Sequence, residues 1–353
     1  MKIAQVSPLY EAVPPQFYGG TERIVSYLTE SLVEAGHDVT LYASGDSVTK
    51  AKLVAVCEHS LRLDTNSVEP VADHMLLLER MMQDASSYDI VHSHIEYLGF
   101  PFLRRLTVPH LTTLHNRLDV SNYRNLFHEF EDEPLVSISD SQRQPLPWNK
   151  WEGTVYHGIP ENLYHLQEKP GEYVAFIGRF SPEKKVDDAI EIARQAGLPL
   201  KIAAKVDEKD RQYFETSVRP LLQKSDIEFI GEIGEKEKQE FLGNALALLF
   251  PIDWPEPFGL VMIEAMACGT PVVAHRCGAI PEVIDEGMTG YIFSDLAQAA
   301  SLVRKATSLD RRRCRQQFEE RFTSQRMAAD YVQIYNKLIH ETATGTKSYG
   351  RCH

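Results

Sequence analysis

The sequence has no apolar run long enough to cross a membrane. Its longest such run extends from Ala245 to Ile252, whereas a spanning helix needs about 20 residues. The chain begins with Met1 and Lys2 and continues at once into the strand-like residues 3–6, without the apolar block of a secretory signal peptide. We therefore expect a soluble protein of the cytoplasm.

Cysteine is scarce, and its spacing is not that of a metal site. An odd number of scattered cysteines without paired ligand spacing indicates reduced thiols. The cysteines are Cys57, Cys268, Cys277, Cys314 and Cys352. The sequence also contains no Asp-x-Asp, the acidic pair that commonly clamps a divalent metal on a diphosphate, and neither a G-x-G-x-x-G nor a P-loop. We expect chemistry that needs no metal and no cofactor.

Positive charge is in deficit. The chain carries 37 Lys and Arg against 50 Asp and Glu, a net charge of -13, and the first 165 residues contribute 12 of the former and 22 of the latter. Phosphate backbones and anionic lipids bind through clustered Lys and Arg. The charge therefore disfavours a nucleic-acid partner and stable membrane docking, and it leaves the oligomeric state open.

The chain does have short apolar segments that alternate with helical patterns, which is typical of parallel βα units in an α/β protein. At 353 residues it is long enough for two cores. In the first half a helix is predicted from Glu22 to Ala35, with Ile24, Val25, Leu28 and Leu32 on one stripe. Strands are predicted there at 2–7, 38–43, 89–94, 110–115, 135–139 and 154–157.

The pattern restarts after a polar linker at 160–173 that contains Pro170 and Gly171. Strands are predicted at 173–177, 200–204, 227–230, 245–250, 271–274 and 291–293, and one helix from Arg311 to Ile339. We expect a domain at 1–165, a second at 166–325, a helix at 326–340 that packs back on the first domain, and a disordered tail at 341–353. Ligands of doubly wound sheets bind beyond the carboxyl ends of the strands, so the chemistry should lie there.

The most informative stretch extends from Pro255 to Val273 and holds two carboxylates, Glu256 and Glu264, eight positions apart. A helix opening between them would span about 12 Å at most over that distance, which suits the two ends of one nucleotide-sugar. The amides of Phe258, Gly259 and Leu260 would lie at the positive end of the helix, where a diphosphate or sugar oxygen is favoured. Taken alone, each glutamate is more often a solvated surface residue.

This stretch resembles the donor-binding motif of the family-four retaining glycosyltransferases, which have the GT-B fold, and the resemblance covers Met1 to about Leu338. It implies two facing Rossmann-like domains with a cleft between them: an acceptor-side domain and a donor-binding domain. It also implies that Glu256 grips the transferred sugar and Glu264 the ribose of a nucleotide-diphosphate sugar.

A charged turn, 178–185, follows the first strand of the second half. Arg179 and Lys184 could neutralise a leaving diphosphate, although a solvated turn is the commoner explanation of such residues. In the resembling family the matching Arg and Lys contact the donor pyrophosphate. Many members have Gly where Lys185 stands, so this loop is slightly atypical.

Two histidines, His92 and His94, would share one face of a strand. They could be structural, contact a substrate, or form part of a zinc site that lacks an evident third ligand. The resemblance favours His94 as a contact to the transferred sugar. His115, which ends another strand, is a candidate for acceptor binding.

Weaker candidates complete the predicted site. Gly19 and Gly20 could bring backbone amides close to the diphosphate, and Ile233 could lie beside the base or in the core. Ser139, Gln142 and the pair His157-Gly158 are placed near the cleft by resemblance only. Glu235 and Lys238 lie in a polar helix start and are candidates for contact with the base, although we interpret most of that helix start as a solvated charged face. The aromatic cluster Phe127, Phe130, Trp148 and Trp151, interleaved with Glu129, Glu131 and Asp132, could line an acceptor pocket or cover the domain edge.

These observations favour a glycosyltransferase that moves a hexose from a nucleotide-diphosphate sugar, UDP-glucose or another UDP-sugar in preference to a GDP-sugar, with retention and without a metal. The acceptor would be a hydroxyl of an unidentified small molecule or glycan, and the loops at 8–18 and 118–134 should shape its site. Alternatives are a nucleotide-sugar epimerase of the same architecture and a non-catalytic subunit that binds sugar nucleotides.

Overall fold

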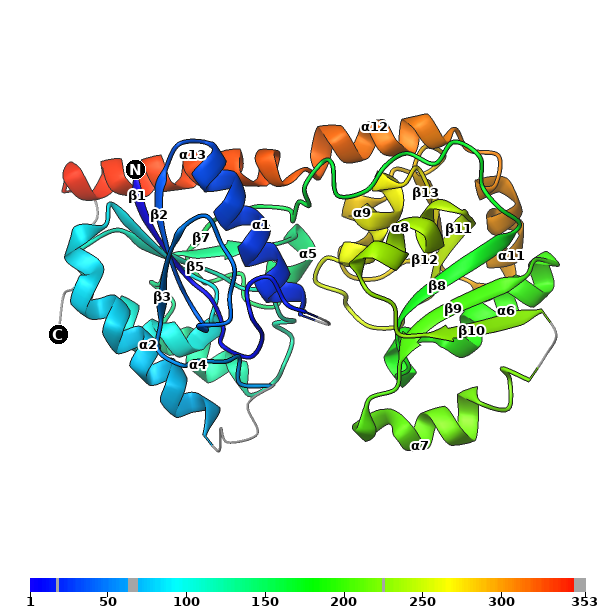
Figure 1. Cartoon of the computed structure of the whole chain (residues 1–353), viewed down its shortest axis with the longest axis horizontal. Coiled ribbons are helices and arrows are strands. Elements are labelled where there is room, and N and C mark those ends of the chain that lie inside the picture. The colour runs from blue at the N-terminus through cyan, green and yellow to red at the C-terminus, as the bar shows by residue number, and fades with distance from the viewer. Residues whose placement is uncertain (17–18, 63–68, 224–225, 346–353) are drawn as a thin grey trace. The chain divides into compact units, whose positions relative to one another are not determined.

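The computed structural model describes residues 1–16, 19–62, 69–223 and 226–345, and the chain forms two compact units (Figure 1). The first unit comprises Met1–Pro160 with Ser324–His353, and the second comprises Glu161–Thr323. The second unit thus starts at the beginning of the polar linker, whereas the sequence placed the boundary at 165/166.

The first unit is built on a sheet of seven parallel strands in the order β3-β2-β1-β4-β5-β6-β7. The chain starts in the middle of the sheet, moves to one edge and returns to the other side, which is the doubly wound order. The strands are β1 (Lys2–Val6), β2 (Asp38–Ala43), β3 (Lys52–Ala55), β4 (Ile90–Ser93), β5 (His110–Thr113), β6 (Leu135–Ser137) and β7 (Trp151–Thr154).

Helices cover both faces of this sheet because neighbouring residues of a strand point to opposite sides. Leu41 packs with Val25 of α1, whereas Tyr42 packs with Leu77 of α2. The predicted stripe of α1 is buried. The helical elements are α1 (Gly20–Glu34), α2 (Pro70–Asp84), η1 (Ala85–Ser87), η2 (Glu96–Gly99), α3 (Phe100–Leu103), α4 (Tyr123–Glu129), α5 (Asp140–Arg143) and α13 (Ser324–Ala343).

The second unit repeats this plan with six parallel strands in the order β10-β9-β8-β11-β12-β13. Its core includes Phe176, Ile202 and Leu249 of the sheet together with Ile190 of α6 and Val303 of α11. The strands are β8 (Tyr173–Arg179), β9 (Leu200–Lys205), β10 (Ile227–Gly231), β11 (Ala245–Phe250), β12 (Val272–His275) and β13 (Gly290–Phe293). The helical elements are η3 (Pro182–Lys184), α6 (Val186–Ala196), η4 (Glu208–Asp210), α7 (Arg211–Tyr213), η5 (Phe214–Val218), α8 (Glu235–Gly243), α9 (Leu260–Ala267), α10 (Ile280–Val283), α11 (Leu296–Ala306) and α12 (Arg311–Arg321).

Three predictions about elements were wrong. The strand expected at 154–157 is Trp151–Thr154, and β3 was not predicted because its burial is only partial. The single helix expected at 311–339 is two helices, α12 and α13. Phe322 leaves the helical region at φ -132°, and its side chain is buried against Phe258. Packing of that ring takes precedence over helix continuation.

The C-terminal helix α13 belongs to the first unit and packs on α1. It continues to Ala343, past the predicted start of the tail at 341, while residues 346–353 of that tail, with Cys352, lie outside the described residues. The other four cysteines are free thiols.

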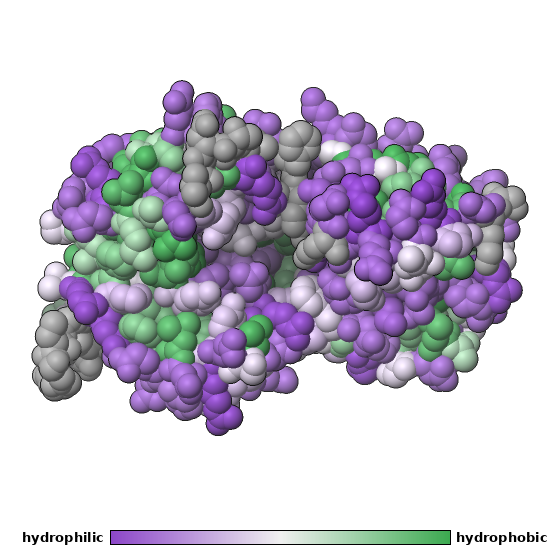
Figure 2. All heavy atoms as spheres, turned by 90° about the horizontal axis from the view of Figure 1, so that it is seen from below, coloured by the Kyte–Doolittle hydropathy of each residue, from purple (hydrophilic) through white to green (hydrophobic). Residues whose placement is uncertain are grey.

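Hydrophilic side chains cover most of the face shown in Figure 2, with small apolar areas between them. Within the ranges that the structure describes, no helix has both the length and the apolar character that crossing a bilayer requires.

Candidate active site

The charged motifs of the second unit follow two adjacent strands at the point where the strand order reverses. Strand β8 ends at Arg179 and β11 at Phe250, and these strands are neighbours although β9 and β10 separate them in sequence. Such a switch point opens a crevice beyond the strand ends. Both predicted motifs, 178–185 and 255–273, start there.

Lys184 and Glu256 form the centre of this site. Lys184 Nζ donates to Glu256 Oε2 at 2.8 Å, and Trp254 Nε1 donates to the same oxygen at 2.7 Å. The indole ring also lies 4.7 Å from Lys184 Nζ, within range of a cation–π contact. The side chains of Lys184 and Glu256 are only 16% and 14% exposed. Oε1 of Glu256 has no hydrogen-bond partner in the described part of the chain, so it is the oxygen available to a ligand.

The backbone of Glu256 is fixed by a close approach of Gly278. This glycine has φ +50°, and a Cβ atom there would overlap the backbone nitrogen and oxygen of Glu256. Ala279 N–H donates to the Glu256 carbonyl at 2.9 Å. The carboxylate is thus held through its backbone as well as through Trp254 and Lys184. Sequence reasoning overlooked both Trp254 and Gly278.

Glu264 lies on α9 and pairs with Lys238 of α8. Lys238 Nζ donates to Glu264 Oε1 at 2.8 Å, and the two side chains are 13% and 4% exposed. The interpretation of this helix start as a solvated face is therefore wrong for Lys238. Its spacing of three and four residues from the buried Phe241 and Leu242 places all three on one helix face, and this signal could have identified it.

Arg179 is incompletely satisfied by the protein. Its terminal nitrogens lie 3.5 Å from carboxylate oxygens of Glu183 and Asp207, beyond good hydrogen-bond distance. Its Nε is buried and has no partner among the residues described. A guanidinium in this condition favours an anionic ligand with closely spaced oxygens. Nearby, Lys185 adopts φ +53°, which explains why glycine suits that position.

The remaining predicted donor residues contribute in different ways. Gly259 adopts φ +86° and caps the start of α9, where Leu260 is the first helical residue. The side chain of Phe258 is buried against Phe322, so only its backbone can reach a ligand. Ile233 is half-buried in the connection between β10 and α8, and the structure brings it to none of these contacts.

Histidines gather at the ends of β4 and β5 in the first unit. His92 is bonded through Nδ1 to Tyr335 Oη and through Nε2 to Thr113 Oγ1, both at 2.7 Å. His94 is bonded through Nε2 to Gln5 Oε1 at 2.8 Å and through Nδ1 to His115 Nε2 at 2.9 Å. All four ring nitrogens of His92 and His94 thus have protein partners, which argues against the zinc alternative. No group of three potential metal-ligating side chains occurs in residues 1–16, 19–62, 69–223 and 226–345.

Burial keeps these imidazoles neutral. Desolvation lowers the pKa of His92 and of His94 well below the ordinary value, and it lowers the pKa of His115 to about 3. His157, which stacks on His115 at a centroid distance of 5.3 Å, also has a lowered pKa because it is buried. His115 Nδ1 is buried without a hydrogen-bond partner among the described residues. It is therefore a nitrogen through which this cluster can accept a bond from a ligand.

The segment that carries His115 is held by residues of the same unit. Glu96, at φ +54°, accepts through Oε1 from the backbone N–H groups of His115 and Asn116 at 2.8 and 3.1 Å. Burial raises the pKa of Glu96 to about 7. Gln142 Nε2 donates to the carbonyls of Leu114 and Asn116, and Ser139 caps the helix that carries Gln142. Ser139 and Gln142 thus position this segment, and sequence reasoning missed Glu96.

The Gly19-Gly20 turn opens α1. Gly19 is its N-cap, and a Cβ there would lie 2.8 Å from Pro15 Cβ, so the close packing requires glycine. Gly20 is exposed, and no atom lies near a Cβ built on it. Residues 17 and 18 of the predicted acceptor loop lie outside the described residues. Beneath the turn, burial raises the pKa of Glu22 to about 7.

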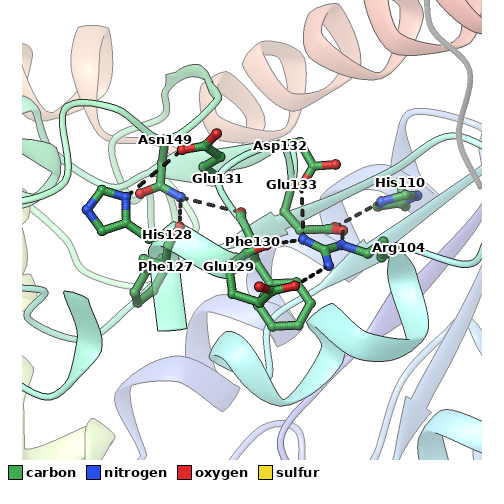
Figure 3. Close-up of polar contacts among 10 residues, drawn as sticks. All are labelled: Arg104, His110, Phe127, His128, Glu129, Phe130, Glu131, Asp132, Glu133 and Asn149. Carbon is green, nitrogen blue, oxygen red and sulfur yellow. Dashed lines mark hydrogen bonds and ion pairs between the residues drawn. The ribbon is translucent and has the colours of Figure 1, made fainter. Parts of the chain in front are cut away.

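The aromatic cluster belongs to a core of the first unit, and Figure 3 shows two of its members, Phe127 and Phe130. Phe127 is buried in a core with Phe100, and Trp148 and Trp151 pack against that core. The Arg104 guanidinium lies 4.2 Å from the Phe130 ring centroid. Arg104 also pairs with Glu129 and Asp132, and His110 pairs with the buried Glu133 at 3.1 Å. These contacts favour the domain-edge alternative over an acceptor pocket.

Comparison with known proteins identifies the family. Residues 164–323 match the family model "Glycosyl transferases group 1", and residues 18–143 match "Glycosyltransferase Family 4". The chain belongs to the group 1 glycosyltransferases. The identification covers most of both units, and the predicted family and enzyme class are confirmed.

Among relatives of this glycosyltransferase, the N-acetyl-alpha-D-glucosaminyl L-malate synthase of Bacillus anthracis is 27% identical over 93% of this chain and 96% of its own. AviGT4, a glycosyltransferase involved in avilamycin A biosynthesis, has a TM-score of 0.73 at 22% identity and covers 96% of this chain and 98% of its own. HepE of Anabaena in complex with UDP has a TM-score of 0.72 at 17% identity, over 96% and 100%. Two parallel-sheet α/β domains of this kind confirm the GT-B fold.

Proposed function

We propose that this glycosyltransferase moves a hexose from a nucleotide-diphosphate sugar to a hydroxyl acceptor, with retention and without a metal. The observation that carries the proposal is the Lys184–Glu256 pair beside Trp254 at the strand switch point. It combines a cation for a leaving diphosphate with a carboxylate for sugar hydroxyls. Arg179, whose buried Nε has no hydrogen-bond partner among the described residues, supplies a second cation.

Each side chain has a role in this proposal. Arg179 and Lys184 neutralise the charge that develops on the diphosphate, which lowers the barrier directly. Glu256 accepts sugar hydroxyls through Oε1 while Oε2 stays anchored. Glu264, held by Lys238, accepts from the ribose hydroxyls. The backbone amides at Gly259 and Leu260 face the diphosphate or a sugar oxygen.

Retention follows from reaction on one face of the sugar. The bond from the anomeric carbon to the phosphate oxygen breaks, the acceptor oxygen bonds to that carbon from the same side, and the acceptor proton passes to the released phosphate oxygen. The alternative is a carboxylate nucleophile on the opposite face of the sugar, as in retaining glycosidases, whose two catalytic carboxyl groups lie about 5 Å apart. Anchoring of Glu256 by Trp254 and Lys184 supports a positioning role for it instead.

His115 is the substrate contact that the first unit best supports. Its Nδ1 has no partner among the described residues, whereas both ring nitrogens of His94 are bonded within the protein. We therefore assign the sugar contact expected of His94 to His115, with His94 holding it in place.

The donor is proposed to be a UDP-sugar. The similar fold of HepE was determined with UDP and with UDP-glucose bound, and the absence of an Asp-x-Asp from the sequence favours binding without a metal. The acceptor is proposed to be a small molecule or glycan received by the first unit.

Thermal unfolding with a panel of nucleotides tests the donor site. UDP, GDP and ADP and their glucose conjugates would be added with magnesium and then with excess chelator. A ligand at 100 times its Kd stabilises the protein by about 2.7 kcal/mol, so the cognate base should raise Tm equally under both conditions. Lys238→Ala should reduce this rise, whereas Lys236→Ala, on the exposed side of the same helix, should not. Absence of a shift with every nucleotide would contradict the proposal.

Transfer itself is tested by NMR of the product formed from the cognate donor and an acceptor library. Retention predicts that the anomeric configuration of the donor persists in the glycoside. An inverted product would contradict the one-face mechanism, and an isomerised nucleotide-sugar formed without acceptor would indicate an epimerase.

A further inference from the structure

Seven buried side chains of the first unit form one continuous hydrogen-bond chain. They come from β1, β4, the end of β5 and the C-terminal helix α13, and six of them are at most 1% exposed while His115 is 9% exposed. In order along the chain they are His115, His94, Gln5, Tyr335, His92, Thr113 and Tyr331. Among the ring nitrogens of these three histidines, only His115 Nδ1 lacks a hydrogen-bond partner within the described residues.

Gln5 is the one member whose two ends differ chemically. Its amide oxygen only accepts and its amide nitrogen only donates, whereas hydroxyls and neutral imidazoles can do either. Gln5 Oε1 lies 2.8 Å from His94 Nε2, so that nitrogen carries the proton. His94 Nδ1 is then an acceptor and takes the proton of His115 Nε2 at 2.9 Å. His115 Nδ1 is consequently left as a bare lone pair.

The hydrogen bonds on the other side of Gln5, from Tyr335 to Tyr331, also have a fixed direction. Gln5 Nε2 donates to Tyr335 Oη at 3.1 Å, and this leaves the Tyr335 proton to be donated to His92 Nδ1 at 2.7 Å. His92 Nε2–H then donates to Thr113 Oγ1, which is bonded to Tyr331 Oη at 2.9 Å. Turning the Gln5 amide by half a rotation would reverse every bond and place a proton on His115 Nδ1. One side chain thus sets the direction of the whole chain.

We infer that Gln5 is a positioning and specificity-determining residue that, through His94, fixes His115 as a hydrogen-bond acceptor toward substrate. The inference rests on the proposed role of His115 as a substrate contact. A lone pair at Nδ1 receives a hydroxyl or N–H group and rejects a carboxylate or phosphate oxygen, which has no proton to give. The site therefore selects a substrate group that can donate a hydrogen bond. Burial, which lowers the pKa of all three imidazoles, keeps one proton on each ring.

The direct test is the tautomer of His115 in the full chain, measured by NMR with nitrogen-15-labelled histidine and assigned with His115→Asn. The expected spectrum has protonated Nε2 and unprotonated Nδ1 for His115. A proton on Nδ1 would overturn the inference. This measurement needs no substrate, so it remains decisive even if the wild-type protein binds no nucleotide and the proposed function fails.

Two variants distinguish an effect of Gln5 on hydrogen-bond direction from an effect of Gln5 on side-chain packing. Gln5→Met keeps the volume but removes both amide contacts, and it should give His115 a mixture of tautomers and lower kcat about tenfold, with the KM for nucleotide-sugar changed less than twofold. Tyr335→Phe breaks the chain on the other side of Gln5, where Gln5 Nε2 still lies 3.5 Å from His92 Nδ1. It should preserve the His115 tautomer and most of the activity. Equal loss in both variants with an unchanged tautomer would show that Gln5 acts by packing alone and would overturn the inference.

Discussion

The candidate functional residues of the two units use opposite electrostatics. In the first unit, neutral and deeply buried groups bond to one another, and desolvation lowers the pKa of His92, His94 and His115. In the second, full charges meet in pairs that solvent partly reaches, as Lys184 does with Glu256. Neutral groups recognise hydroxyls through the direction of their hydrogen bonds. In a charged pair, by contrast, the cation can leave its carboxylate and bind an incoming diphosphate. The difference fits the proposed contact to a sugar hydroxyl in the first unit and the proposed binding of an anionic leaving group in the second.

The largest effect should come from removing a charge in the second unit. Lys184→Ala should lower kcat/KM about a thousandfold, because a fixed donor to the developing negative charge is lost. Steady-state kinetics with the cognate donor would measure it, and Lys236→Ala is the matched control. A loss under tenfold would remove Lys184 from the leaving-group site.

The next largest effect concerns stability in the first unit. The pKa of Glu96 is about 7 in the folded protein against an ordinary value of 4.5, so the folded form is favoured below pH 4.5 and loses up to roughly 3 kcal/mol as pH rises through 7. Glu96→Gln keeps an oxygen for the amides of His115 and Asn116 but cannot ionise. In urea unfolding it should be more stable than wild type at pH 8 and equal at pH 4. Equal gains at both values would contradict this explanation.

Removing the charge of Glu256, the carboxylate proposed to bind the sugar, should have a smaller effect. Glu256→Gln should lower kcat about a hundredfold and leave the affinity for the free nucleoside diphosphate unchanged, since the carboxylate is proposed to contact sugar hydroxyls. Calorimetric titration with UDP and turnover with UDP-sugar would separate the two quantities. Full turnover in this variant would refute the role of Glu256.

Trp254→Phe tests whether the hydrogen bond from the indole to Glu256 contributes to turnover. It removes the N–H that anchors Glu256 Oε2 but keeps an aromatic ring near Lys184. Turnover should fall about tenfold, the effect of one hydrogen bond to a charged group, while UDP binding stays unchanged. Weaker UDP binding would show that the indole acts mainly through Lys184.

The smallest effect should arise at Lys185. Its backbone adopts the left-handed conformation, which glycine adopts more readily than a residue with a side chain. Lys185→Gly should raise stability by about 0.5 kcal/mol, since relief of strain is partly offset by the entropy of glycine. Thermal unfolding measures the shift, and a clear decrease in Tm would mean that the Lys185 side chain makes a contact that outweighs the strain.

Sequence patterns predicted the elements that short apolar segments define. The strand at Ala245–Phe250 is confirmed residue for residue, because a buried parallel strand has a continuous apolar run. Strand β3 was missed since its burial is partial. The break at Phe322 depends on a tertiary contact with Phe258, which local periodicity does not encode.

Prediction of the site succeeded where a motif is local and failed where partners are distant in sequence. Glu256 and Lys184 were named, and the structure joins them. Their partner Trp254 lies two residues from Glu256. It was not predicted because tryptophan is read as an apolar residue, and a sequence does not show that its indole N–H donates to a carboxylate. Lys238 was placed in a mostly solvated helix start because four of its neighbours are charged, while its buried partner Glu264 is 26 positions away. The direction of the hydrogen bonds in the histidine chain could not be predicted, because it depends on which end of the Gln5 side-chain amide faces His94.

Because the C-terminal helix belongs to the first unit, that unit can be completed only after the second unit has been synthesised. Tyr331 and Tyr335 of α13 bond with Thr113, His92 and Gln5, yet the ribosome makes them only after the whole second unit. Until then a nascent chain holds three polar side chains of its first sheet without their hydroxyl partners. The amino-terminal unit therefore reaches its final state last, after translation has passed residue 335, and a product that stops at Thr323 would contain the whole second unit but an incomplete first unit.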